Sequence, residues 1–252
     1  MALDQNLQPD VFVRDMATGT TQLASVSSSG VQASDASWMA SISADGNRVS
    51  FRTTASNLVA GDDVQAQSHK DDIFVRDLPS ATTKKVSVKP LSLAVGSMHC
   101  TANNGCNADY DDFMDVDVGR HALSADGRYV TFRGGWGVGA LASEPCTGIY
   151  IRRTVFSADV DAGGDAVPLA SVDEGCNGVP AVSGDGSTIS FRNRANTGWR
   201  TVSPSGGALS ETVPFPVPNS ALSEAVLPFD GRHARFPYGS VEPGGRGHQR
   251  PR

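Results

Sequence analysis

The sequence lacks a hydrophobic run long enough to cross a membrane. No stretch approaches the roughly 18 consecutive apolar residues of a spanning helix, and residues 1–10 lack the basic-then-apolar order of a signal peptide. The sequence therefore predicts no membrane span. It leaves open whether the chain is a mature form or a fragment whose leader was removed.

An excess of basic residues is also missing. The chain has 21 Lys and Arg residues against 27 Asp and Glu residues, which gives a net charge of -6 at pH 7. A protein that binds nucleic acid usually neutralises phosphates with a basic surface. We therefore predict no nucleic-acid partner.

Familiar catalytic motifs are absent. Neither a Gly-x-Ser-x-Gly nucleophile elbow nor a His-Glu-x-x-His zinc motif occurs, and the five histidines show no metal-ligand spacing. His69 and His99 qualify for an acid/base or metal site only together with nearby carboxylates, and are otherwise exposed loop residues. The sequence predicts no catalytic residue, and the balance favours a protein that is not an enzyme.

The four cysteines form no Cys-x-x-Cys pair. Cys100, Cys106, Cys146 and Cys176 are an even set, which is typical of disulfides and favours a secreted or periplasmic location. Of the three possible connectivities, Cys100 to Cys106 with Cys146 to Cys176 is the simplest. The alternative is a thiolate metal site with His99 beside Cys100, although the spacing matches no zinc pattern.

Turn residues and a repeated segment are what the sequence does contain. With 39% hydrophobic residues, 27 Gly and 14 Pro, the composition suits a folded chain rich in turns. The repeated segment occurs four times. In each copy an Asp-Gly pair separates two short runs of alternating apolar residues, which predicts a tight β-hairpin. A phenylalanine follows five residues after each of these glycines. The copies span 41–52, 121–133 and 182–192, with a worn fourth at 229–236, and their phenylalanines are Phe51, Phe132, Phe191 and Phe236.

A second repeated segment lies between these hairpins. It reads Asp-Val-Phe-Val-Arg-Asp at 10–15, Asp-Ile-Phe-Val-Arg-Asp at 72–77 and Gly-Ile-Tyr-Ile-Arg at 148–152. Together the segments resemble the TolB-like propeller family, whose blade reads Ser-Pro-Asp-Gly, an apolar strand, Ile-Tyr-Val-x-Asp and a closing strand. The resemblance covers nearly the whole chain, although Ala or Gly replaces the Pro before Asp45, Asp126 and Asp185. It implies an all-β fold, a β-propeller of four-stranded antiparallel blades.

The spacing of the repeats predicts about four blade equivalents in one domain, residues 1–243, with an unstructured tail at 244–252. The Asp-Gly turns are 81, 59 and 45 residues apart, against roughly 40 to 50 residues for one blade. The first interval therefore carries a long insertion at 89–118. With strands named a to d, the chain holds a c–d pair, three full blades and an a–b pair. It either closes a ring through both termini or is a fragment of a larger ring.

An arginine follows the repeated phenylalanine in three copies, at Arg52, Arg133 and Arg192. Such a series could line an anion-binding ring around the axis. Its recurrence at one strand position favours a packing role instead, against an Asp or a carbonyl of the next blade.

Antiparallel strands place the b–c and d–a loops on one face of a propeller. That face collects the candidate ligand-binding residues, which lie in the b–c loop at 61–72 and in the insertion. They are Asp62, Asp63, His69, His99, Asp109 and Asp111. All four cysteines fall on the same face.

Calcium is the one cofactor that the sequence suggests. Asp159, Asp161 and Asp165 stand in an Asp-x-Asp-x-Gly-x-Asp pattern typical of short calcium loops, without the downstream Glu of an EF-hand. The acids of the insertion offer hard oxygen ligands as well. The alternative in both places is an acidic, solvated loop.

The resemblance implies a non-catalytic, extracytoplasmic scaffold. Such a propeller presents the loops of one face to a protein, peptide or glycan partner, and we expect a monomer. The alternative is an enzyme, or the accessory propeller of a hydrolase or lyase that acts at the axial pocket. A convergent set of His and carboxylate groups in that pocket would favour the enzyme, and a mixed or apolar lining would favour binding.

Overall fold

The structure, a computed structural model, describes residues 4–61, 71–90, 115–138, 150–169, 179–193 and 197–214, and the backbone of two strands at 98–100 and 106–108. The predicted hairpin at 229–236 and tail at 244–252 lie outside these residues. All regular structure in the described residues is β-strand. Among them, no helix is long and apolar enough to cross a membrane.

Three four-stranded antiparallel sheets follow one another along the chain, and in each the strands pair in sequence order. We call them blades 1, 2 and 3. A two-stranded sheet, here called the half-blade, precedes them and consists of β1 (Phe12–Arg14) and β2 (Thr21–Leu23). Blade 1 holds β3 (Ser37–Ile42), β4 (Arg48–Thr53), β5 (Asp72–Asp77) and β6 (Thr82–Lys85). Blade 2 holds β9 (Asp115–Asp117), β10 (Tyr129–Val138), β11 (Tyr150–Asp159) and β12 (Val167–Pro168), and blade 3 holds β13 (Ala181–Val182), β14 (Ile189–Arg192), β15 (Gly198–Val202) and β16 (Val213–Pro214).

These elements confirm the predicted all-β fold and the order of a c–d pair followed by complete blades. Three strands lie where the sequence shows no blade motif. β9 pairs with β10 although it falls within the insertion predicted at 89–118, and β15 and β16 complete blade 3 without the strand-c motif. The rest of that insertion contributes a two-stranded sheet of β7 (Met98–Cys100) and β8 (Cys106–Ala108).

Each first hairpin closes through the same Ser-x-Asp-Gly turn. In blade 1 the Ser43 hydroxyl donates to the Asp45 carboxylate at 2.6 Å and accepts the N–H of Arg48 at 2.9 Å. The N–H of Ser43 donates to the carbonyl of Arg48, so the loop holds residues 44–47 rather than the Asp-Gly pair alone. Gly46 takes a left-handed φ of +75°, which costs glycine little. The same hydrogen bonds recur at 124–127 and 183–186.

The apolar core lies between consecutive blades. Phe132 and Phe156 of blade 2 are fully buried, with ring centroids 5.5 Å apart, and share a layer with Ile73 of blade 1. Phe51 occupies the layer between the half-blade and blade 1, and Phe191 the layer between blades 2 and 3. Burying such a ring stabilises the fold by about 1.5–3 kcal/mol. The repeated phenylalanine therefore marks the layer that joins each blade to the preceding one.

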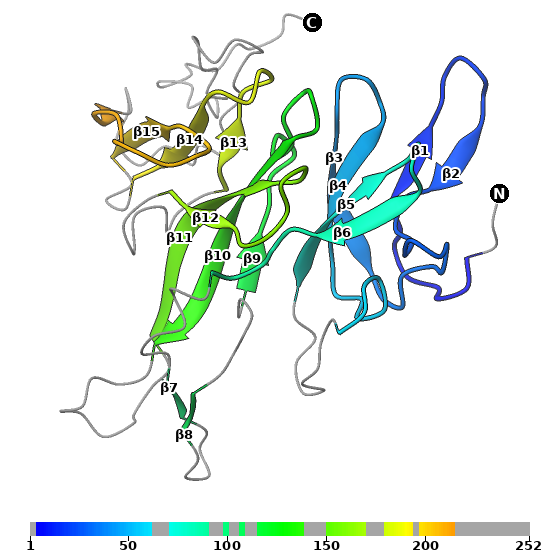
Figure 1. Cartoon of the computed structure of the whole chain (residues 1–252), viewed down its shortest axis with the longest axis horizontal. Coiled ribbons are helices and arrows are strands. Elements are labelled where there is room, and N and C mark those ends of the chain that lie inside the picture. The colour runs from blue at the N-terminus through cyan, green and yellow to red at the C-terminus, as the bar shows by residue number, and fades with distance from the viewer. Residues whose placement is uncertain are drawn as a thin grey trace, which may run out of the picture.

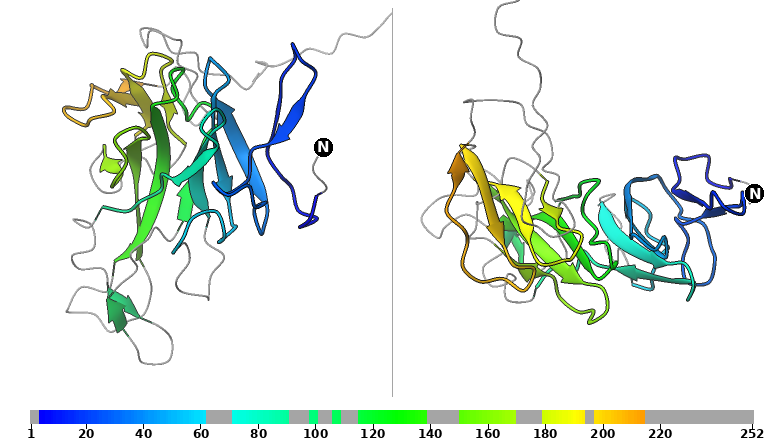
Figure 2. Two further views of the ribbon diagram at one scale, coloured as in Figure 1. Left: turned by 45° about the vertical axis from the view of Figure 1, so that its right-hand side comes forward. Right: turned by 90° about the horizontal axis from the view of Figure 1, so that it is seen from above.

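Backbone hydrogen bonds also join the blades at their turns. The N–H of Ala44 donates to the carbonyl of Ala125, and the N–H of Ala125 donates to the carbonyl of Gly184, each at 2.8 Å. These residues hold the same position in the three turns. Figures 1 and 2 show the result, a row of blades with the half-blade at one end and blade 3 at the other. This arrangement is propeller-like, and the described residues form a row with two ends.

Two glycine substitutions should separate backbone strain from contact between blades. A Cβ at Gly127, where φ is +72°, would lie 2.7 Å from Cδ of Arg48 in blade 1, whereas one at Gly46 meets nothing within 4 Å. We expect Gly46→Ala to lower the free energy of unfolding by about 1 kcal/mol through left-handed strain alone. Gly127→Ala should cost about 2–3 kcal/mol because overpacking adds to that strain. Urea unfolding followed by tryptophan fluorescence measures both, and equal losses would contradict the close contact with Arg48.

Candidate functional site

The connections between strands emerge on two sides of the row. The a–b and c–d turns lie on one, here called the turn side, and the b–c and d–a connections lie on the other, the loop side, because antiparallel strands alternate in direction. In Figure 1 the β3–β4 turn is at the upper end of blade 1, and β7 and β8 are at the lower edge of the molecule. The sequence predicts the ligand-binding residues on the loop side.

Most of those predicted residues lie outside the described part of the chain. They are Asp62, Asp63, His69, Asp109 and Asp111, and the disulfide candidates Cys146 and Cys176 also lie outside it. His99 and Cys100 belong to β7 and Cys106 to β8, and Cys100 and Cys106 are directly opposed partners across the antiparallel pair. Opposed residues have Cα atoms about 4.5–5.5 Å apart, which falls within the range for a disulfide.

A hollow of about 500 Å³ opens on the loop side between two connections, and we call it the loop-side hollow. One wall belongs to the connection from β2 to β3 and the other to the connection from β4 to β5, two residues before Asp62. Its lining therefore combines serine and asparagine residues with apolar ones. The lining residues are Ser27, Ser28, Ser29 and Val31 on one wall and Asn57, Leu58, Val59 and Ala60 on the other.

The walls of this hollow are fastened to each other. Asn57 donates through Nδ2 to the carbonyl of Gln32 and accepts through Oδ1 from the N–H of Ser34, both at 2.9 Å. Ser27 accepts the N–H of Gly30 at its carbonyl, and its hydroxyl accepts the N–H of Val31 at 3.1 Å. A site whose walls are already ordered loses less conformational entropy when a ligand binds.

A second hollow of about 350 Å³, the inner hollow, lies where the first hairpins of the three blades meet. His121 accepts the N–H of Val182 at its carbonyl, 3.0 Å away, which joins blades 2 and 3 at this place. The side chains around the inner hollow are mostly apolar, with one arginine and one histidine and no carboxylate among the described residues. The lining comprises Ala40, Ser41, Ile42 and Ala44 of blade 1, Arg120, His121, Leu123 and Ala125 of blade 2, and Val182 and Gly184 of blade 3.

Strand β3 presents apolar side chains beside the inner hollow. Its pairing with β4 shifts between Trp38 and Ser41, and Met39 there has a φ of +54°. Such a bulge redirects the side chains of a strand. Met39 and Ile42 are 38% and 50% exposed. The inner hollow therefore has a mixed lining of apolar and polar side chains.

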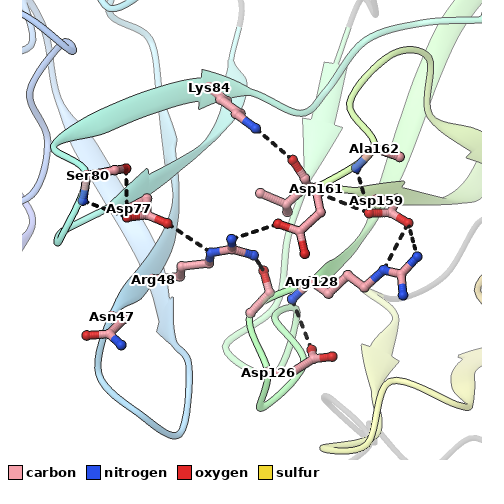
Figure 3. Close-up of polar contacts among 12 residues, drawn as sticks. Asn47, Arg48, Asp77, Ser80, Lys84, Asp126, Arg128, Asp159, Asp161 and Ala162 are labelled. Carbon is pink, nitrogen blue, oxygen red and sulfur yellow. Dashed lines mark hydrogen bonds and ion pairs between the residues drawn. The ribbon is translucent and has the colours of Figure 1, made fainter.

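Asp159 and Asp161, predicted for calcium, lie in the c–d turn of blade 2 on the turn side (Figure 3). Asp159 accepts hydrogen bonds from Arg128 at 3.1 and 2.9 Å and from the N–H of Ala162 at 3.0 Å. Burial alone would raise the pKa of Asp159, but these contacts together lower it. No three His, Cys, Asp or Glu side chains of the described residues are grouped to hold a metal ion. Calcium at Asp159, Asp161 and Asp165 stays a prediction.

Arg48 joins blades 1 and 2 on this side (Figure 3). Its guanidinium contacts Asp77 of its own blade at 3.1 Å and, in blade 2, Asp161 at 2.7 Å and the carbonyl of Gly127 at 3.2 Å. The hydrogen bond to Asp161 is the main reason why the pKa of Arg48 is raised. The N–H of Ser80 is the main cause of the lowered pKa of Asp77, to which Arg48 adds. These groups form a structural bridge between the two blades.

Arg52 makes the corresponding link near the loop side. Its Nη1 atom lies 3.1 Å from Asp117 of blade 2, which also binds Arg133 at 2.9 Å, and its Nη2 atom contacts Asp71. The guanidinium stands 5.5 Å from the ring centroid of Trp38. For Arg52, the predicted contact with an Asp of the next blade is therefore confirmed.

Sequence reasoning did not identify the loop-side hollow or the role of Arg48. The serines and Asn57 of the hollow bind backbone groups of irregular connections, and such contacts leave no periodic pattern in the sequence. A weak signal for Arg48 does exist, because Asp77 and Asp159 both end a third strand and both pair with an arginine that follows an a–b turn.

Comparisons with known proteins assign neither a family nor a function. No protein-family model and no curated protein matches the sequence. Among solved structures, Kuenenia stuttgartiensis hydrazine synthase aligns with a TM-score of 0.41 and 13% identity over 96% of this chain and 68% of that chain. The tricorn protease aligns at 0.38 and 11% over 88% and 18%, and a mitotic checkpoint complex chain at 0.27 and 13% over 92% and 82%. The TolB-like resemblance thus rests on the repeated motifs.

The bridge at Arg48 gives a stability test. We expect Arg48→Gln to lower the free energy of unfolding by about 1 kcal/mol, because partly exposed ion pairs contribute modestly and two carboxylates lose their partner. Arg128→Gln is the matched control, since Arg128 is half exposed and pairs with Asp159 within its own blade. Urea titrations of both variants at low and high salt measure the losses. A loss at Arg48 no larger than at Arg128 would contradict a bridge between blades.

Proposed function

We propose that this chain is a non-catalytic β-propeller scaffold whose loop side binds a protein, peptide or glycan partner. The observation that carries the proposal is the loop-side hollow of about 500 Å³, whose walls are tied by Asn57. It combines serine hydroxyls with Val31, which is 53% exposed, and Leu58, which is buried. Apolar surface with a few fixed polar groups is the usual composition of a binding site.

An enzyme acting at the inner hollow is the other function considered. General acid/base catalysis requires a titratable group held by a partner that sets its protonation state. Arg120 and His121 line the hollow together with mostly apolar side chains. This lining supports binding, and it provides a second, smaller surface for a partner.

The proposed secreted or periplasmic location rests on the cysteines. The opposed positions of Cys100 and Cys106 in β7 and β8 support a disulfide between them, with Cys146 and Cys176 left as the second pair. A bridge across β7 and β8 would stiffen a loop-side element of the partner-binding face.

The disulfides can be tested by counting thiols. We expect the protein secreted from an oxidising compartment to show no reactive thiol in denaturant before reduction and four afterwards. Cys100→Ser should expose one thiol, and peptide mapping should identify it as Cys106. Four reactive thiols before reduction would contradict both bridges, and a thiol at Cys146 or Cys176 in the Cys100→Ser variant would contradict the pairing.

The binding site can be tested with two exposed valines. Ligands are first selected with the wild-type chain from a random-peptide library and a glycan array. The affinities of the wild-type, Val31→Glu and Val213→Glu chains for these ligands are then compared. Val31 is 53% exposed at the loop-side hollow and Val213 is 58% exposed in blade 3, so the exchanges are matched. We expect Val31→Glu to weaken binding at least tenfold because a charge would be desolvated there. Equal affinity of the two variants would place the site elsewhere.

A further inference from the structure

The half-blade is an incomplete copy of blade 1. Its segment 10–15 reads Asp-Val-Phe-Val-Arg-Asp, and the third strand of blade 1 reads Asp-Ile-Phe-Val-Arg-Asp at 72–77. In blade 1 this strand, β5, pairs with β6 on one edge and with β4 on the other. In the half-blade β1 pairs with β2 alone. The edge of β1 that corresponds to the β4 side therefore has no partner strand in the described residues.

The backbone groups on this edge can be identified from the register. The N–H of Ala24 donates to the carbonyl of Val11, and the N–H of Asp15 donates to the carbonyl of Thr20. Because hydrogen-bonded pairs alternate along antiparallel strands, Val11, Val13 and Asp15 face β2. Phe12 and Arg14 consequently direct their N–H and C=O groups toward the open edge.

Side-chain burial also indicates that β1 lacks a partner strand on this edge in the described residues. Phe74 of β5 is fully buried, and its ring stacks on Phe51 of β4 with centroids 6.1 Å apart. Phe12, the equivalent residue of β1, is 41% exposed. The strand that would complete the half-blade should therefore carry a phenylalanine opposite Phe12, as Phe51 is opposite Phe74.

The sequence contains one further segment with this pattern. Phe236 follows Gly231 by five residues, which is the spacing of Phe51, Phe132 and Phe191 after their turn glycines. The Asp-Gly pair at 230–231 also lies 45 residues after that of blade 3, one blade length along the chain. Pro237 corresponds to Arg52 of blade 1. At this position the backbone N–H points to the first strand of the blade and not to the third. The proline therefore removes no hydrogen bond to a β1 edge.

The positions of the half-blade and blade 3 determine whether this segment comes from the same chain or from a second copy of it. The turn-to-turn hydrogen bonds run from blade 1 to blade 2 to blade 3, so the next hairpin would extend the row beyond blade 3. Figure 1 shows blade 3 and the half-blade at opposite ends of that row. A hairpin added beyond blade 3 would thus extend the end of the row that lies opposite the half-blade of its own chain.

We propose that the hairpin at 229–236 of one copy pairs with the open edge of β1 of a second copy, head to tail, with Phe236 stacked on Phe12. Each contact makes one composite blade. Two copies contribute three complete blades each and share two composite blades, which gives eight, within the four to eight blades of known propellers. A contact of this kind replaces the monomer expected from the sequence and does not depend on the proposed ligand site.

Mixing two single variants of the full chain tests the proposal. Copies carrying Phe12→Cys and copies carrying Phe236→Cys are combined and oxidised, so that a bond between the new cysteines can form only between chains. We expect a covalent dimer whose linked peptides contain positions 12 and 236, and light scattering of the wild-type chain at twice its single-chain mass. The wild-type chain, oxidised in parallel, shows any linkage by the native cysteines.

A second pair of variants covers the case in which a cysteine variant fails to fold. Phe12→Asp should weaken dimerisation at least tenfold with an unchanged far-ultraviolet spectrum, whereas Met16→Asp, at an exposed site of the neighbouring turn, should leave it intact. A monomeric wild-type chain would overturn the proposal. So would linkage of positions 12 and 236 only in a double variant, because the hairpin would then close the ring of its own chain.

Discussion

The architecture depends on the Ser-x-Asp-Gly turn, because this turn closes a hairpin and positions the next blade at once. The Ser43 hydroxyl and the Asp45 carboxylate take the N–H groups of Arg48 and Asn47. With those donors satisfied inside the loop, the N–H of Ala44 is available to the carbonyl of Ala125 in the adjacent turn. The apolar layers between blades 1 and 2 and between blades 2 and 3 lie between sheets whose relative position these backbone bonds restrict.

The repeated elements of this fold could be predicted from the sequence, whereas the strands without a repeated motif could not. The hairpins and the phenylalanines that follow them recur at a fixed spacing, so the turns and the repeat positions of Phe51, Phe132 and Phe191 could be located from the sequence. The strand Gly198–Val202 could not, because strand pairing uses backbone groups and requires no motif. Its Arg200 lies opposite Phe191, where the other blades have a second phenylalanine. The two-residue strand Val213–Pro214 is too short to show any alternation.

The sequence predicted the side of the row on which the candidate site lies, but not the residues that line it. Strand direction alone places the b–c and d–a connections together, and the loop-side hollow lies there. Its walls depend on how Asn57 binds the loop backbone at 32 and 34, which spacing does not encode. The acidic pattern at 159–165 has calcium-like spacing, yet Asp161 pairs with Arg48 of another blade. A local pattern cannot reveal a partner more than one hundred residues away.

Because each apolar layer of the described residues is shared by two sheets, none of the three described blades has a core of its own, and this bears on how such a chain changes length. The long connection between blades 1 and 2 enters after β6, where it interrupts neither a turn-to-turn bond nor the Phe132 layer. Whole repeats can be gained or lost in the same way, since a new blade brings one face for each neighbour. The size of the molecule is thus determined by what covers its two outermost faces rather than by the volume of a central core.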